Sequence, residues 1–305
     1  MNPFDAVFVG GFTADGEPMM VLATEQPQPT PGFTGRITKD VLERIHLERF
    51  RGDYLLRHGH VPFEEVRVGP NPPDFIVVGE VDEALDCAAF AVETRRLGYR
   101  LVDHLRRRLL DDAGTRDFSG VRDSVVTVTF FGIDEYLPPK RTDDGIVEPL
   151  RDTIASLHID REAVARFIAE TARDDQMPDR LPVTVATTPD GLAHVTANPI
   201  DASQLPSGPL VERFGFGLTF NMPHQHRIGE LTPELQRLVT QHDYPTIEHL
   251  LVTAGGPDVD GIRYPSEEAL AAFLLDHAPG VVAKHISRVT MHLWQTTEVR
   301  DIAVR

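Results

Sequence analysis

The chain has 305 residues, of which 41% are hydrophobic and 25% are charged, as expected for a globular protein with a sizeable core. Its 47 acidic and 30 basic residues give a formal net charge of −17, which argues against a broad nucleic-acid-coating surface but leaves room for a local basic groove or a basic protein partner. The single cysteine, Cys87, excludes an intrachain disulfide, and no apolar run is long enough to span a bilayer. We therefore expect a cytoplasmic protein with no membrane partner.

The N-terminal segment predicts a hairpin followed by a long helix. Residues 5–24 contain two apolar runs around a turn with Asp and Gly. A helix is expected to begin after Thr38, a suitable N-cap, and to run to about His58. Gly59 is expected to end it, because glycine readily adopts the left-handed backbone conformation found after helices.

Three strands are predicted next. Residues 62–68 alternate between apolar and polar, which indicates a first strand, and the prolines of 69–73 then stop regular structure. Residues 74–78 and 84–91 indicate a second and a third strand around a turn centred near Val81.

Two aspartates of this hairpin are expected to lie side by side. Asp74 begins one strand, and counting back from the turn places Asp86 to Ala88 beside it. Neighbouring carboxylates repel each other and lose hydration on burial, and a cation between them removes that cost. Mg²⁺ is often held by one or two carboxylates, with waters or phosphate oxygens in its other positions. The pair therefore predicts a Mg²⁺ site suited to phosphodiester hydrolysis.

The order of these features resembles the PD-(D/E)XK nuclease superfamily, whose fold is restriction-endonuclease-like. The resemblance rests on Pro73-Asp74, then a hairpin, an acidic residue on the return strand and a helix, and it covers roughly residues 38–111. It implies that acidic residues bind Mg²⁺ and that a lysine two positions after the second acid orients water. It also implies a further glutamate from the preceding helix, for which Glu43 or Glu48 is suitable.

The chain departs from the family pattern at the lysine. If Asp86 is the second acid, Ala88 stands where the lysine is expected. A second alignment uses Glu93 as the acid, which puts Arg95 in the lysine position. Both alignments remain open, so the resemblance implies Asp74, Asp86, Glu93 and Arg95 as catalytic residues, with Asp74 and Asp86 as metal ligands.

A helix is predicted over residues 92–110, where leucines recur four apart on one face. Arg96, Arg100 and Arg107 gather on a flank of this helix. One interpretation is that Arg96 and Arg100 bind substrate phosphate beside the acid pair. The other is a solvated face on which the arginines pair with nearby aspartates.

The remainder of the chain alternates between strands and helices. The middle segment predicts a strand, two helices and a hairpin, at residues 124–131, 147–157, 161–172 and 181–200. The last third predicts a strand, a helix, a strand, a helix and two strands, at residues 214–220, 232–240, 247–254, 267–277, 281–294 and 299–304.

A pair of histidines, His224 and His226, stands two residues apart after the strand at 214–220. On an extended chain both point the same way, so they are able to share a metal ion. The alternative interpretation is a structural or loop role for both.

These elements predict an α/β (α+β) fold with a mixed central sheet flanked by helices, in which a restriction-endonuclease-like core carries an inserted middle segment. Residues 1–111 would hold the N-terminal hairpin and half of the core, and residues 112–210 would form the insertion. Residues 211–305 would supply the strands and helices that complete the sheet.

Three functions are compatible with the sequence. The first is a Mg²⁺-dependent nuclease acting on DNA or RNA, in which Glu48 or Glu65 assists and Arg95 or Arg96 replaces the lysine. The second is a catalytically inactive nuclease-fold protein that binds a protein partner within a bacterial complex, which the absent lysine and the acidity favour. The third is a metal hydrolase that uses the histidine pair.

Overall fold

The structure is a computed structural model of the chain, and we describe it over the residues whose placement is defined. These are residues 8–24, 28–70, 72–79, 81–92, 104–111, 116–130, 143–171, 184–191, 193–200, 202–205, 208–277 and 279–305.

The chain forms two compact units. The first combines residues 1–92 with residues 225–305, and the second consists of residues 93–224. The chain therefore leaves the first unit once and returns to it. The boundaries fall at 92/93 and 224/225, whereas the sequence predicted an insertion over residues 112–210.

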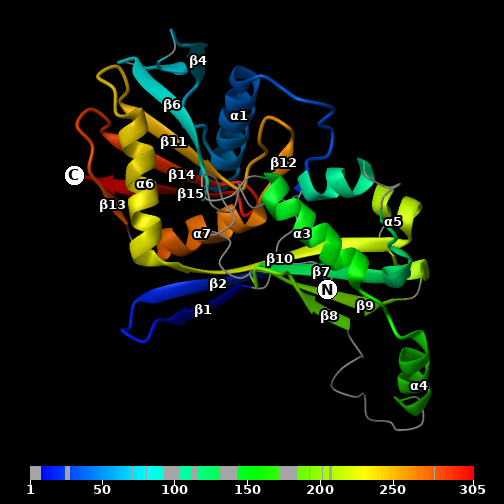
Figure 1. Cartoon of the computed structure of the whole chain (residues 1–305). Helices are drawn as coiled ribbons and strands as arrows, with labels where there is room; N and C mark the ends of the chain where they lie inside the picture. Colours follow the sequence, from blue (N-terminus) through cyan, green and yellow to red (C-terminus); the bar gives the residue numbers. More distant parts are fainter. Residues whose placement is uncertain are drawn as a thin grey trace. The chain divides into compact units, whose positions relative to one another are not determined.

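The first unit is built on a mixed sheet with the strand order β13-β15-β14-β11-β6-β5-β4 (Figure 1). Its strands are β4 (Glu65–Val68), β5 (Phe75–Val78), β6 (Glu83–Phe90), β11 (His249–Ala254), β13 (Gly280–Val281), β14 (Arg288–Leu293) and β15 (Glu298–Val304). Strands β4, β5 and β6 form an antiparallel meander, whereas β11 runs parallel to both β6 and β14. The predicted mixed sheet is confirmed.

Helices cover both faces of this sheet. They are α1 (Lys39–His58), α6 (Ile228–His242) and α7 (Pro265–Asp276). On one face Phe50 of α1 packs against a cluster that includes Cys87, and on the other face Leu235 of α6 and Leu274 of α7 pack against a cluster that includes Ala88. Successive residues of a strand point to opposite faces, which explains why β6 is apolar almost throughout.

The predicted helix at the start of the chain is confirmed. Helix α1 ends at His58, and Gly59 follows with φ 76° and donates its backbone N–H to the Leu55 carbonyl. Thr38 precedes the helix but makes no side-chain capping hydrogen bond. The amphipathic face of α1, rather than a cap, is therefore what fixes the helix on the sheet.

The helix that connects β6 to the parallel strand β11 is α6, which begins 138 residues after the end of β6 (90 to 228). The sequence had predicted a helix directly after β6, at residues 92–110. Residues 104–111 are helical, and Leu105 and Leu109 are fully buried, but this segment belongs to the second unit.

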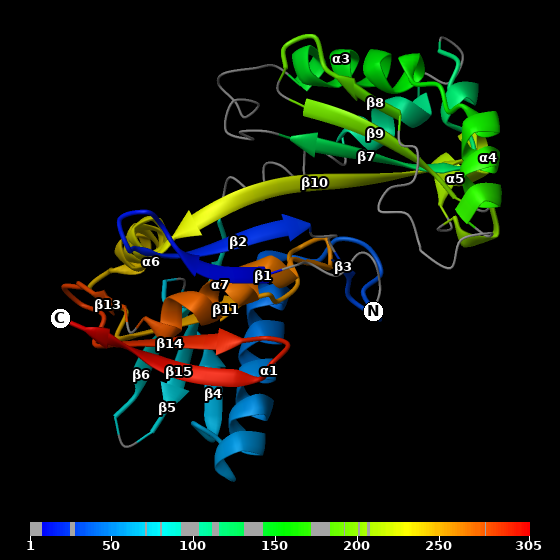
Figure 2. The same ribbon diagram turned by 90° about the horizontal axis from the view of Figure 1, so that it is seen from below.

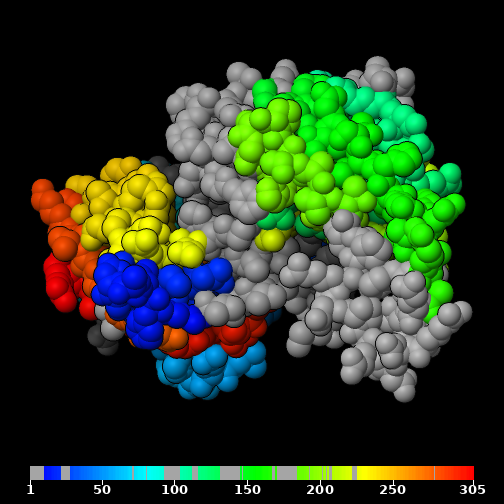
Figure 3. Space-filling model, turned by 60° about the horizontal axis from the view of Figure 1, so that its bottom comes forward, coloured from blue at the N-terminus to red at the C-terminus, as the bar shows by residue number. Residues whose placement is uncertain are grey.

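Smaller elements complete the first unit. The predicted N-terminal hairpin is confirmed as β1 (Phe8–Phe12) paired with β2 (Pro18–Thr24), and β3 (Gln28–Pro29) pairs with β12 (Ile262–Arg263). The carboxylate of Glu17 in the hairpin turn accepts a hydrogen bond of 2.7 Å from the backbone N–H of Gly229 in α6. Figure 3 shows the hairpin, in blue, beside the yellow surface of α6.

The second unit is built on the strands β10-β7-β9-β8 (Figure 2). These are β10 (Phe216–Arg227), β7 (Ser124–Phe130), β9 (Ala193–Pro199) and β8 (Thr184–Thr187). The helices are α3 (Asp143–Ser156), α4 (Arg161–Thr171) and α5 (Pro209–Phe214), with short 3₁₀ turns at η1 (Ser119–Val121) and η3 (Ala202–Gln204). Strands β7, β9 and β8 are antiparallel, and β10 runs parallel to β7.

The strand β10 is longer than the sequence predicted. It continues to Arg227 through the two histidines, whereas the predicted strand ended at Phe220. The ladder with β7 ends at Asn221, so the missing N–H of Pro223 removes no bond from that pairing. Elsewhere in this unit the predicted strand, helix pair and hairpin are confirmed, and α5 was not predicted.

In the described part of the chain, no helix has the length and apolar character needed to cross a lipid bilayer.

Candidate functional site

The two aspartates predicted to be neighbours are in contact. The register of β5 and β6 pairs Phe75 with Leu85, so Asp74 and Asp86 occupy the next pair along the hairpin. The backbone N–H of Asp74 donates to Asp86 Oδ1 at 3.3 Å, and the N–H of Cys87 donates to Asp74 Oδ2 at 2.9 Å. Both carboxyl groups are buried, with 7% and 5% of their residues exposed. The predicted adjacency is therefore confirmed.

Burial makes this pair unlike two ordinary surface carboxylates. Burial and then a hydrogen bond with Asp86 raise the pKa of Asp74 to about 7. Burial also opposes ionisation of Asp86, but hydrogen bonds with His242 and Asp74 outweigh it and hold the pKa of Asp86 below its usual value. Close to neutral pH the two groups therefore share about one proton, which is the behaviour expected of like charges in contact.

His242 is the third member of the cluster and was not predicted. It occupies the last turn of α6, and its Nδ1 lies 2.5 Å from Asp86 Oδ2. The contact ties the end of α6 to the carboxylate of β6. The two residues are 156 positions apart in sequence, and no local spacing links them.

The first turns of α1 bring a carboxyl group and an ammonium group to the same place. Glu43 is buried, and its Oε1 lies 2.9 Å from the Nζ of Lys39. Burial raises the pKa of Glu43, and the nearby charge of Asp86 adds to this. The hydrogen bond with Glu43 raises the pKa of Lys39, and the charges of Asp74 and Asp86 raise it further.

A cavity of about 340 Å³ opens at this cluster. Residues 40, 41, 43 and 44 of α1, residues 68 and 69 and residues 74 and 75 line it. Gly69 allows the loop to close at its rim, because a Cβ there would lie 2.0 Å from the Pro73 carbonyl oxygen. The backbone N–H of Gly69 donates to the Asp74 carbonyl at 2.8 Å, which fixes the start of β5 beside the cavity.

The other glutamates predicted to assist lie elsewhere. Glu48 pairs with Arg51 at 3.1 Å, and Glu65 pairs with Arg67 at 2.8 Å on an exposed strand. Neither residue lines the cavity. Of the two glutamates considered on α1, the structure therefore brings Glu43 to the acid pair.

The predicted residues Glu93, Arg95, Arg96 and Arg100 lie outside the described residues. The described end of the same arginine-rich segment belongs to the second unit, where Arg108 pairs with Glu148 at 3.3 Å.

The structure describes one side chain of the predicted histidine pair. His226 is buried in β10, and the side chain of His224 lies outside the described residues. Within the described part of the chain, no group of three or more His, Cys, Asp or Glu side chains is arranged to hold a metal ion.

The acid pair itself meets the needs of Mg²⁺, which is commonly bound through one or two carboxylates and retains waters. Two carboxyl groups that share a proton become two carboxylates when a divalent cation replaces that proton. Cys87 adds no nucleophile, because burial holds the pKa of its thiol well above the usual value. The chemistry available at this site is therefore that of oxygen ligands, one imidazole and one ammonium group.

We found no matching protein-family model, no matching curated protein and no matching solved structure for this chain.

Proposed function

We propose that this protein is a Mg²⁺-dependent nuclease that hydrolyses phosphodiester bonds of DNA or RNA. The observation that carries the proposal is the hydrogen-bonded pair of buried aspartates, Asp74 and Asp86, of which Asp74 lines a cavity together with Glu43. A carboxylate pair of this kind is poorly suited to stability, since desolvation and mutual repulsion both act against it. Such arrangements are most often found where a protein binds a cation or carries out catalysis.

The order of elements around the site supports a PD-(D/E)XK core. A helix carrying a buried glutamate precedes a hairpin, the first strand of that hairpin follows Pro73-Asp74, and the return strand carries Asp86. The core is then extended by α6 and the parallel strand β11. In this proposal the second unit is an insertion between β6 and α6.

In the proposed site Asp74 and Asp86 hold the metal, and Mg²⁺, when bound, supplies charge stabilisation and an activated water. His242 is a positioning residue, because its contact with Asp86 Oδ2 fixes that carboxylate. The resemblance assigns a lysine to the position of Ala88. In its place, Lys39 supplies the ammonium group. Its Nζ is held by Glu43 and feels the charge of both aspartates, so it is suited to donate to a phosphate oxygen.

The test is cleavage of single- and double-stranded DNA and RNA by the full chain with Mg²⁺, Mn²⁺ or no metal. We expect metal-dependent cleavage that falls by at least about a thousandfold in Asp74→Asn and in Asp86→Asn, as is usual when a group acting in the transition state is removed. Lys39→Met should lower the rate at unchanged Mg²⁺ affinity. Glu65→Gln, an exposed carboxylate outside the cavity, is the matched control and should cleave normally. The absence of cleavage across all substrates and metals would contradict the proposal.

A second candidate is an inactive protein of the same fold that binds a protein partner. The buried Ala88, in the position that resemblance assigns to lysine, favours it, as does the net charge of −17. In that case the protein should co-purify with a partner, and Asp74→Asn should leave the association unchanged. A cleaving enzyme that needs Asp74 would exclude this second candidate.

A further inference from the structure

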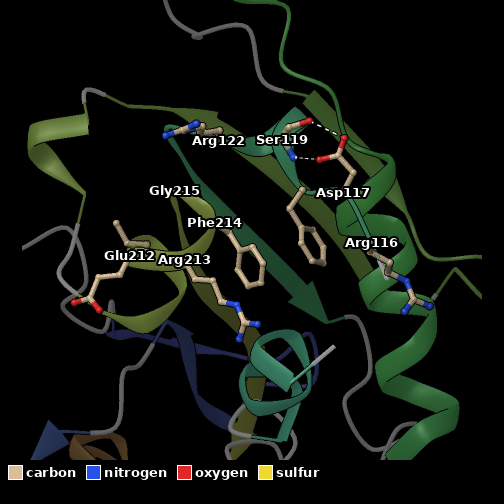
Figure 4. A pocket seen from close by; sticks show the side chains of 10 residues that line it. Arg116, Asp117, Ser119, Arg122, Glu212, Arg213, Phe214 and Gly215 are labelled. Carbon is tan, nitrogen blue, oxygen red and sulfur yellow. Dashed lines mark hydrogen bonds between the residues drawn. The ribbon is translucent and has the colours of Figure 1, made fainter. Parts of the chain in front are cut away.

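A second cavity lies within the second unit and takes no part in the acid site. Its volume is about 490 Å³, and Figure 4 shows the side chains that line it. They come from residues 116–119 and 122, around η1, and from residues 211–215, at the end of α5. This volume is typical of small-molecule sites, which range from about 300 to 1,000 Å³.

Three arginines line this cavity, and one of them is already neutralised. The guanidinium of Arg116 donates to Asp152 Oδ1 at 2.6 Å and to Glu148 Oε2 at 3.0 Å. Two carboxylates therefore balance its charge, and Arg116 serves the internal structure of the unit.

The other two arginines form no ion pair with a carboxylate among the described residues. The guanidinium of Arg213 donates to the Leu110 carbonyl oxygen and lies 5.5 Å from the centroid of the Phe214 ring. The guanidinium of Arg122 forms no hydrogen bond or ion pair with the described residues. Because the protein has a net charge of −17, two guanidinium groups at one cavity, with no carboxylate partner among the described residues, are a local exception to its electrostatics.

Gly215 shapes the wall along which Arg122 passes. Its φ is 74°, which L side chains rarely adopt, and a Cβ there would lie 2.9 Å from Cγ of Arg122. Glycine at this position therefore both ends α5 and leaves room for the stem of the arginine.

The two acidic residues that line the cavity, Asp117 and Glu212, form no ion pair with these arginines. The carboxylate oxygens of Asp117 accept hydrogen bonds from the backbone N–H and the hydroxyl of Ser119, at 2.8 and 2.9 Å (Figure 4). Figure 4 also shows the side chain of Glu212 extending away from the Phe214 ring and the Arg213 guanidinium.

Aromatic rings supply a flat apolar surface in the same cavity. The rings of Phe118 and Phe214 meet edge to face with centroids 5.2 Å apart, and Phe214 is only half buried. One face of the Phe214 ring stacks on Phe216, with centroids 6.1 Å apart, so a nucleobase would stack on its other face, beside the Arg213 guanidinium. Guanidinium groups bind phosphate with directed, charge-assisted hydrogen bonds.

We propose that this cavity binds a nucleoside phosphate, with Arg122 and Arg213 on the phosphate and Phe214 on the base. The ligand is either a free nucleotide or a nucleotide within a strand, because both present the same phosphate and base. The site goes beyond the proposed hydrolysis and does not depend on the acid pair.

The test measures binding of labelled AMP to the full chain by equilibrium dialysis, with adenosine, inorganic phosphate and a short single-stranded oligonucleotide as competitors. We expect AMP to bind at least about tenfold more tightly than adenosine or phosphate alone, because each of these lacks half of the contacts. Arg122→Gln should weaken AMP binding at least about tenfold, since it keeps part of the stem but removes the charge. Phe214→Leu should weaken AMP but leave phosphate competition unchanged.

Arg166→Gln, an exposed arginine of α4 outside the cavity, is the matched control and should bind AMP normally. Asp74→Asn should also bind AMP normally, so failure at this site and failure of the nuclease proposal are distinguishable. If only the oligonucleotide binds, and Arg122→Gln weakens that binding, the ligand is a nucleotide within a strand. If neither ligand binds, or if Arg122→Gln binds both as the wild type does, the proposal is wrong.

Discussion

The aspartate–histidine pairs Asp53–His292 and Asp86–His242 of the first unit differ in what surrounds them. Asp53 is 2% exposed, and its Oδ2 accepts from Arg49 Nε at 2.8 Å and lies 2.9 Å from His292 Nε2. Asp86 also faces a histidine, but its other neighbour is a second carboxyl group, that of Asp74. The first carboxylate has a cation on one side and an imidazole on the other. The second has an acid in place of the cation.

This difference separates an arrangement that stabilises the fold from one that prepares a site. A buried carboxylate with charge-assisted hydrogen bonds on both sides is satisfied within the protein. A buried acid pair at a cavity is satisfied only in part, and a proton or a cation from outside completes it. The predictions below test that contrast, beginning with the largest expected effect.

Asp53→Ala should lower the free energy of unfolding by about 3 kcal/mol. The substitution leaves the imidazole of His292 buried without its acceptor and removes the partner of Arg49, which is the kind of loss that costs most in a buried network. Urea unfolding at pH 7 measures the effect. Arg49→Gln, which leaves the carboxylate and the histidine in place, should cost much less. Equal losses in the two variants would mean that Asp53 is held chiefly by Arg49.

Asp74 should make the protein less stable as the pH rises. Its pKa is about 7 in the folded protein and close to 3.8 in the unfolded chain, so the folded state keeps a proton that the unfolded state has released. Stability from this group is therefore complete below about pH 4 and is lost as the pH rises through about 7. Because the two acids titrate as a coupled pair that is partly open to solvent, we expect a loss of about 1–2 kcal/mol over this range.

The measurement for Asp74 is the difference in unfolding free energy between Asp74→Asn and the wild type at several pH values. That difference should grow in favour of the variant from pH 5 to pH 8. Saturating Mg²⁺ should reverse the trend for the wild type at pH 8 and leave the variant unaffected, since ligand binding stabilises only the state that binds it. A difference that does not vary with pH would show that the two acids do not share a proton.

His242→Asn should weaken Mg²⁺ binding about tenfold, or by about 1.4 kcal/mol, without loss of the fold. Residues that orient a metal ligand typically affect affinity by 10–100-fold, and the low end applies because the imidazole is partly exposed to solvent. Calorimetric titration with Mg²⁺ is the measurement. His249→Asn, at a buried histidine that contacts Thr290 rather than an aspartate of the site, is the control and should leave Mg²⁺ affinity unchanged. An unchanged affinity in His242→Asn would remove its positioning role.

The sequence predicted the parts of the fold that depend on local patterns. Alternation and turn residues placed β4, β5 and β6, and Gly59 placed the end of α1. The same counting along the hairpin placed Asp74 beside Asp86, because register on a short ribbon follows from the turn. The partners that come from distant segments were not predictable in this way. His242 reaches Asp86 only because α6 packs on the sheet after the chain has passed through a whole second unit.

Lys39 shows a second reason for an incomplete prediction. Its position four residues before Glu43 is visible in the sequence, but that spacing also describes an ordinary surface ion pair on a helix. Only the burial of Glu43 and its closeness to the aspartates distinguish a pair that belongs to the site from a surface ion pair. The resemblance implied two candidate glutamates, and burial selects between them.

The smallest effect is expected for that second glutamate, Glu48. Its side chain is half exposed and pairs with Arg51 on the same helix, so Glu48→Gln should change the unfolding free energy by less than about 0.5 kcal/mol and leave cleavage and Mg²⁺ affinity unchanged. Glu43→Gln removes an equal charge from the same helix, but at the buried end that faces the acid pair, and should lower the cleavage rate. Both variants remove one negative charge from α1, so a difference in their cleavage rates reflects the buried position of Glu43. Equal rates in both would mean that α1 contributes no carboxylate to the site, and the acid pair would then act with Lys39 alone.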